Sequence, residues 1–307
     1  MRRFAAFSIL LAIVAGCSAP PLPPESRDPD LASVARGARL AYEAGHLERA
    51  ERMYRDALDR ARAMDDPELI STEAYNLAVC LLEAGRFDPA EAALREAAAE
   101  ARRAGMDDRE LTVASAKLAY LRGRPQEAAA LAGSIPAGAR GPDDAVAFEA
   151  HVLKARLAID AADLAGARAE AEAAEKAGGD PPPPGRRAKV AGIRGRILLA
   201  EGRPGPAAVE FDREAGGLRE AGRFADMIEA LERAGEAHAG SGSSAEAADR
   251  FYRAGRALAG KGGREAALPL IERAAAEAAK GGDKDLKARI SDLLDGIRDG
   301  SPGQAGK

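Results

Sequence analysis

The residue types that most often carry catalysis or bind metals are few in this sequence and lie far apart. Its three histidines, His46, His151 and His238, stand in different parts of the chain. No group of His, Cys, Asp or Glu has the short spacing of a metal site. No glycine-rich phosphate loop, Gly-x-Ser-x-Gly or His-Glu-x-x-His motif occurs. We therefore expect a protein that is not an enzyme and that uses no cofactor or metal ion; an enzyme built from dispersed residues is the minor alternative.

Cys17 has the clearest predicted chemical fate. Arg2 and Arg3 precede an apolar run at residues 4–15, which is too short to span a bilayer comfortably and is typical of a secretory signal peptide. The run ends in Val-Ala-Gly-Cys at residues 14–17. This ending resembles a bacterial lipobox, and the resemblance implies cleavage before Cys17 and lipidation of that residue.

The lipobox resemblance also predicts an address. Ser18 follows the cysteine, where inner-membrane retention signals usually carry Asp, so we expect a lipid anchor on the periplasmic face of the outer membrane, with the inner membrane as the alternative. Residues 1–16 form the predicted lipoprotein signal peptide. Residues 17–30 contain the lipidated Cys and a proline-rich stretch, which predicts an extended tether.

Cys80 is the second and last cysteine of the chain. If Cys17 is lipidated, no intramolecular disulfide can form. Because Cys80 lies in the apolar run at residues 77–82, we interpret it as a small buried side chain of a helix. A reactive thiol is the alternative.

Paired carboxylates at residues 65–66, 107–108 and 143–144 invite an acid–base or metal-binding interpretation. All three pairs, however, directly precede stretches with helical periodicity. Acidic side chains there accept hydrogen bonds from free backbone N–H groups and meet the positive end of the helix dipole. We therefore predict that these residues cap helices.

The elements that position these residues are set by a repeat. A turn residue recurs about every 40 residues, at Gly45, Gly85, Gly123, Ala162, Gly202, Gly242 and Gly282. Five residues after each comes an alanine, except after the last, where Lys287 stands. A fixed period of this length is typical of a solenoid of repeated supersecondary units.

Each turn residue separates two stretches with apolar residues at three- and four-residue steps, which predicts helix pairs. The predicted pairs are 32–44 with 47–63, 68–84 with 87–104, 109–122 with 125–134, 143–161 with 164–177, 186–201 with 204–221, 224–240 with 243–260, and 264–280 with 284–298. The second helix of the third pair is short. The proline tract at 181–184 preserves the period, so we interpret it as a loop between repeats; a kink between two half-arrays is the alternative.

The residue pattern within the pairs resembles the tetratricopeptide repeat. In the first pair Ala38 and Ala41 precede Gly45, and Ala50 and Tyr54 follow it. The resemblance implies an all-α, right-handed α-solenoid of about seven antiparallel helix hairpins over residues 31–299, followed by a disordered tail at 300–307. The period near 40 departs from the usual 34, which indicates a variant with longer helices.

The same resemblance implies that the first helix of each hairpin lines a concave groove, into which the residue six before the turn points. That column reads Arg39, Val79, Lys117, Arg156, Arg196, Glu236 and Ala276. The predicted groove residues are Arg39, Tyr42, Tyr75, Asn76, Lys117, Tyr120, Arg156 and Arg196. A basic column beside tyrosines suits a partner segment with acidic and apolar residues. The alternative is a merely solvated face.

Composition narrows the class of function further. Hydrophobic residues make up 46% of the chain but aromatic residues only 4%, so helices must pack mainly through small and aliphatic side chains. The formal net charge of -4 argues against binding to nucleic acid. We expect a non-enzymatic, membrane-anchored scaffold or adaptor of the cell envelope that binds a protein or peptide partner, in outer-membrane, secretion or pilus assembly. A regulatory adaptor of a cell-wall enzyme is the alternative.

Overall fold

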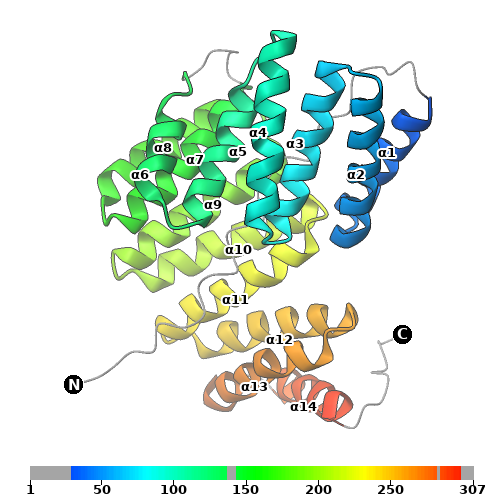
Figure 1. The fold of residues 1–307 in the computed structure, drawn as a ribbon. Coiled ribbons are helices and arrows are strands. Elements are labelled where there is room, and N and C mark those ends of the chain that lie inside the picture. The colour runs from blue at the N-terminus through cyan, green and yellow to red at the C-terminus, as the bar shows by residue number, and fades with distance from the viewer. Residues whose placement is uncertain (1–28, 137–142, 282–283, 299–307) are drawn as a thin grey trace. The chain divides into compact units, whose positions relative to one another are not determined.

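The computed structural model describes residues 29–136, 143–281 and 284–298. Within these residues the chain contains fourteen helices and no strand, and consecutive helices pack as seven pairs (Figure 1). The all-α architecture of helix pairs predicted from the sequence is thus confirmed. The predictions for the signal peptide, Cys17 and the tail at 300–307 lie outside the described residues.

The helices belong to two compact units, residues 1–139 and 140–307. Unit 1 contains α1 (Pro29–Glu43), α2 (Leu47–Ala63), α3 (Pro67–Glu83), α4 (Phe87–Ala104), α5 (Arg109–Leu121) and α6 (Pro125–Gly133). Unit 2 contains α7 (Ala145–Asp160), α8 (Leu164–Ala177), α9 (Pro184–Ala200), α10 (Pro204–Glu220), α11 (Phe224–Gly240), α12 (Ser244–Gly260), α13 (Arg264–Gly281) and α14 (Lys284–Arg298).

This division refines the single repeat domain expected over residues 31–299. The boundary falls between residues 139 and 140. Residues 181–183 of the proline tract lie in the loop between α8 and α9, inside unit 2, as predicted, and Pro184 begins α9. Observed and predicted helix ends agree to about three residues or better.

The turn column has a backbone cause. Gly45 has φ 78, in the left-handed region that glycine enters without steric cost. The N–H of His46 then donates to the carbonyl of Ala41 at 2.9 Å, which closes the end of α1. Ala162, which fills the gap in the glycine series, has φ 58 and therefore adopts the same conformation despite its Cβ.

Glycines inside the first helices of unit 2 make room for aromatic rings. A Cβ added at Gly235 in α11 would lie 2.7 Å from the ring of Phe251 in α12. Gly195 in α9 meets Phe211 of α10 in the same way, at 2.6 Å. Both rings are at most 1% exposed. Close contact between a bare backbone and a ring thus holds these hairpins together.

The acidic pairs behave largely as capping residues. The Asp66 carboxylate accepts hydrogen bonds from the backbone N–H groups of Glu68 and Leu69, at 3.1 and 3.2 Å. Asp144 caps α7 in the same way. At α5 the prediction needs correction, because Asp108 makes no capping hydrogen bond and the preceding Asp107 accepts from the N–H of Arg109 at 3.0 Å instead.

Two further findings bear on the predictions. Cys80 is fully buried in α3, its Sγ donates to the carbonyl of Leu47 at 3.5 Å, and burial raises the pKa of its thiol to about 12. This confirms a structural cysteine. None of the helices in the described ranges has the length and apolar composition that crossing a membrane requires.

Candidate functional site

Six of the eight predicted groove residues lie on the first helices of unit 1. We call them the unit 1 first-helix surface: Arg39 and Tyr42 on α1, Tyr75 and Asn76 on α3, and Lys117 and Tyr120 on α5. All but Asn76 are half-buried, and Asn76 is 1% exposed. The Tyr42 hydroxyl donates to the Glu83 carboxylate at 3.3 Å, which joins α1 to α3, and α3 in turn packs against α5.

The charges on this surface are partly neutralised. Arg39 pairs with Glu43, four residues on, at 2.8 Å, and its side chain is 31% exposed. Val79, at the position equivalent to Arg39, is fully buried. Tyr75 is therefore the partly exposed part of α3 among the predicted residues.

The two remaining predicted residues lie in unit 2. Arg156 is on α7 and Arg196 on α9, and both are half-buried. The basic column predicted from the sequence is therefore divided between the units. Arg39 and Lys117 lie in unit 1, and Arg156 and Arg196 lie in unit 2.

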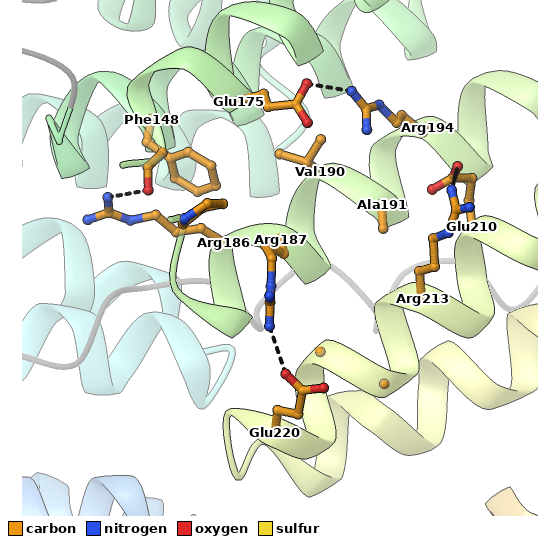
Figure 2. Close-up of a pocket in the computed structure, with 14 residues that line it drawn as sticks. Phe148, Glu175, Arg186, Arg187, Val190, Ala191, Arg194, Glu210, Arg213 and Glu220 are labelled. Atoms are coloured by element: carbon orange, nitrogen blue, oxygen red, sulfur yellow. Dashed lines mark hydrogen bonds and ion pairs between the residues drawn. The ribbon is translucent and has the colours of Figure 1, made fainter. Parts of the chain in front are cut away.

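Sequence reasoning missed a pocket of about 480 Å³ in unit 2 (Figure 2). Its floor is apolar, with Val190 and Ala191 from α9, Phe148 from α7, and Gly216 and Gly217 from α10. Gly178 and Pro182 also line it, and the four arginines and three glutamates of the lining form ion pairs. This combination of apolar floor and charged rim is common in ligand and partner sites.

Three ion pairs surround the floor and can be followed in Figure 2. Arg187 of α9 binds Glu220 of α10 at 2.7 Å, and Arg194 of α9 binds Glu175 of α8 at 2.6 Å. The third pair, Arg213 with Glu210 at 2.5 Å, lies along α10.

Arg186 holds one end of the pocket. Its guanidinium lies 5.5 Å from the centre of the Phe148 ring and donates to the carbonyl of Gly178 at 3.0 Å. It also pairs with Asp143 at the start of unit 2. Because these contacts use both the face and the donors of the guanidinium, Arg186 is a structural part of the wall.

Charged residues and a glycine line the pocket at positions where the first two repeats carry core residues. Glu175 of α8 and Gly178, which directly follows that helix, occupy the positions that Leu58 and Ala61 hold in α2, where exposure is 2% and 0%. In α9, the positions of Arg187 and Arg194 correspond to buried residues of α3, Ile70 and Leu77. Charged residues at positions that Leu58, Ile70 and Leu77 hold in the first two repeats are the signal by which the sequence could have revealed the pocket.

The pocket and the predicted column lie on different faces of α9. Arg194 lines the pocket, whereas Arg196 does not. Residues two apart on a helix point in nearly opposite directions, about 200° apart. The pocket is therefore a second candidate surface, separate from the predicted one.

The two histidines of unit 2 contact carboxylates of neighbouring helices. His151 contacts Glu170 at 2.6 Å, and His238 contacts Asp212 at 3.1 Å. Burial opposes ionisation of Asp212, but hydrogen bonds from Arg250 and His238 outweigh it and hold the pKa of this carboxyl below its usual value. Across the ranges that the structure describes, no cluster of His, Cys, Asp and Glu could hold a metal ion.

No protein-family model matches this chain, and no curated protein sequence matches it. Among solved structures it is similar to a tetratricopeptide repeat protein from Parabacteroides merdae, with 14% identity over 88% of this chain and 100% of the other, at a TM-score of 0.44. It is also similar to the TPR2AB domain of yeast Sti1 in a pHSP90 complex, with 15% identity over 88% and 98% of the two chains, at a TM-score of 0.33. At these values neither likeness assigns a partner to this chain.

Proposed function

We propose that this protein is a non-enzymatic scaffold, anchored by a lipid on Cys17 in a bacterial cell envelope, that binds a polypeptide partner on the unit 1 first-helix surface. The observation that supports it most is the arrangement of that surface. Two first helices, α1 and α5, carry a basic and a tyrosine side chain at partly exposed positions in equivalent register, Arg39 with Tyr42 and Lys117 with Tyr120, and α3 adds the partly exposed Tyr75 at another register position.

The chemistry of these side chains favours a segment with acidic and apolar residues. Tyr42, Tyr75 and Tyr120 offer large rings with a polar edge, a type of side chain enriched in protein interfaces. Arg39 and Lys117 lie beside them and supply positive charge, which orients an acidic partner and raises its association rate.

The anchor and the address rest on the sequence around Cys17. The apolar run, the Val-Ala-Gly-Cys ending and Ser18 together support a lipoprotein on the periplasmic side of the outer membrane. A scaffold held there can bring a partner to an outer-membrane, secretion or pilus assembly. The repeat architecture suits this role because solenoids present extended surfaces for binding.

Crosslinking in intact cells, followed by mass spectrometry of captured proteins, tests the proposal. The double variant Arg39→Glu with Lys117→Glu should reduce capture of an envelope partner about tenfold or more, because it reverses the charge that orients the segment. The matched control is Arg52→Glu with Arg95→Glu, two exposed arginines on α2 and α4. Equal capture by wild type and the first double variant would sink the proposed surface.

A further inference from the structure

The pocket of unit 2 has two arginines at a spacing that matches two turns of a helix. Arg187 and Arg194 are seven residues apart on α9, a distance of about 10.5 Å along the axis. Val190 and Ala191 lie between them, on the same face of the helix. The α9 part of the pocket floor is thus an apolar surface, formed by Val190 and Ala191, with a guanidinium at each end.

Both guanidinium groups retain donors for a further anion. Arg187 and Arg194 each donate one hydrogen bond, to Glu220 and Glu175 respectively. A guanidinium has five N–H donors, so each arginine can donate hydrogen bonds to a second carboxylate while it keeps its bond to the first. The two existing ion pairs also cost little free energy to break. All four side chains are 40% to 54% exposed, and ion pairs this exposed contribute little stability.

The pocket has room for a side chain from outside. Its volume of about 480 Å³ lies within the usual range for ligand sites, roughly 300–1,000 Å³. A Cβ added at Gly216 would have no neighbour within 4 Å, so the wall formed by α10 is open there. Val209, which is 48% exposed, is on the same face of α10 as Arg213, four residues on, and extends the apolar surface.

We infer that this pocket binds a helical polypeptide segment whose apolar side chains enter between Arg187 and Arg194 while two carboxylates, seven residues apart on the segment, pair with these arginines. An amphipathic helix docking its apolar face into a hollow is a general mode of recognition. The site lies in unit 2, whereas the surface proposed above lies in unit 1, so it does not depend on the function proposed above.

A designed probe tests the chemistry of the ligand. The probe is a capped, fluorescein-labelled, alanine-based helical peptide of about 16 residues, with two glutamates seven residues apart and two leucines between them. Fluorescence anisotropy with the full-length chain should show saturable binding. Replacing both glutamates by glutamine, or both leucines by alanine, should weaken binding at least about tenfold. No binding of the first peptide, or equal binding of all three, would overturn the inference.

Variants of the chain test the place of binding. Gly216→Leu fills the open wall of the pocket and should weaken binding of the glutamate–leucine peptide at least about tenfold. Its matched control is Gly296→Leu in α14, where an added Cβ likewise meets nothing within 4 Å. Both changes replace a helical glycine by a good helix former, so neither should unfold the protein. Unchanged binding by Gly216→Leu would refute the pocket as the site.

Charge reversal gives an independent measurement. The double variant Arg187→Glu with Arg194→Glu should bind the glutamate–leucine peptide about tenfold or more weakly than the wild-type chain does. Its weak binding of the glutamine peptide should be nearly the same as that of the wild-type chain. Arg256→Glu, an exposed arginine of α12 outside the pocket, serves as the control. Equal losses of affinity for both peptides would show that Arg187 and Arg194 do not bind the carboxylates of the peptide.

Discussion

Glu73 of α3 is a charged residue at a repeat position where α5, α9 and α13 carry apolar ones. It is fully buried, and neither of its carboxylate oxygens has a hydrogen-bond partner of acceptable geometry. Equivalent positions hold Leu111, Val190 and Leu270, all buried. Burial raises the pKa of Glu73 from 4.5 to about 7, and the nearby Asn76 side chain offsets only part of that rise.

This pKa predicts a pH-dependent stability of unit 1. The folded pKa lies above the unfolded one, so the folded state holds the proton more tightly. The stabilisation that this tighter proton binding gives the folded state is complete below pH 4.5 and is lost as the pH rises through about 7. A rise of this size corresponds to about 3 kcal/mol. The free energy of unfolding, measured with urea, should therefore fall between pH 4.5 and 7 and level off above.

Glu73→Leu should remove this dependence and stabilise the protein at pH 8 by about 2 kcal/mol or more, because no buried charge remains. Glu68→Gln changes an exposed glutamate of the same helix and should preserve the slope. A wild-type stability that is flat from pH 4.5 to 7 would contradict the prediction.

Gly235 supports a second prediction at single-residue scale. In Gly235→Ala the new Cβ would lie 2.7 Å from the Phe251 ring, which is 1% exposed and has no room to move away. We expect a loss of about 1–3 kcal/mol in the free energy of unfolding, as for other overpacked cores. Gly216→Ala, where the space is open, should instead gain up to about 1 kcal/mol from helix propensity. Urea unfolding followed by circular dichroism distinguishes the two, and a neutral Gly235→Ala would refute the tight contact.

At the scale of helices and turns, Ala162 gives the clearest prediction. Its φ of 58 places a Cβ in the left-handed conformation, which costs roughly 1 kcal/mol for a residue other than glycine. Ala162→Gly should therefore stabilise the turn between α7 and α8 by about 0.5–1 kcal/mol in urea unfolding. Ala161→Gly, at φ -83, should destabilise instead, because glycine there only adds unfolded-state entropy. The reverse order of the two variants would contradict this account.

The helices themselves were predictable from the sequence because each end has a local cause. Gly45 and four of its equivalents, Gly85, Gly123, Gly202 and Gly242, adopt the left-handed conformation at a turn, and Asp66 and Asp144 cap the helices that follow. A second series of left-handed turn residues, Gly105, Gly222 and Gly262, comes after the second helices and was missed, although it follows the first series by a constant 20 residues. The ends of the helices are therefore set by individual residues at regular positions in the sequence.

The candidate sites were less predictable, because burial depends on neighbours that no single repeat specifies. Asn76 was predicted to line a groove and is buried, whereas Tyr75, the adjacent residue, is half-exposed. The pocket is lined by residues of α7, α8, α9 and α10, which belong to two consecutive helix pairs and come together only in the fold. Periodicity predicts which face of a helix is apolar, but a hollow results from the sizes of side chains across a contact.

At the scale of the whole molecule, the proposed lipid anchor on Cys17 predicts where the protein resides. In cells that process lipoproteins, Cys17→Ser should release the protein from the membrane fraction, because a single anchoring residue would then be missing and no described helix can cross a bilayer. Fractionation and blotting measure this. Cys80→Ser is the control, since that buried thiol should not affect partitioning. Continued membrane association of Cys17→Ser would contradict the lipoprotein proposal.

The two compact units predict how the chain unfolds. One apolar core, which includes Tyr54 and Leu81, lies within unit 1, and the cores that include Phe148, Phe211 and Phe251 lie within unit 2. Because each unit has its own core, we expect two unfolding transitions in urea.

The variants described above assign these transitions. Glu73→Leu should raise the midpoint of one transition at pH 8 and leave the other unchanged, and Gly235→Ala should lower the midpoint of that other transition. Circular dichroism and limited proteolysis at intermediate urea concentrations measure them separately. If both variants shift the same single transition, the chain unfolds as one cooperative body, and the free energies of the two cores are coupled.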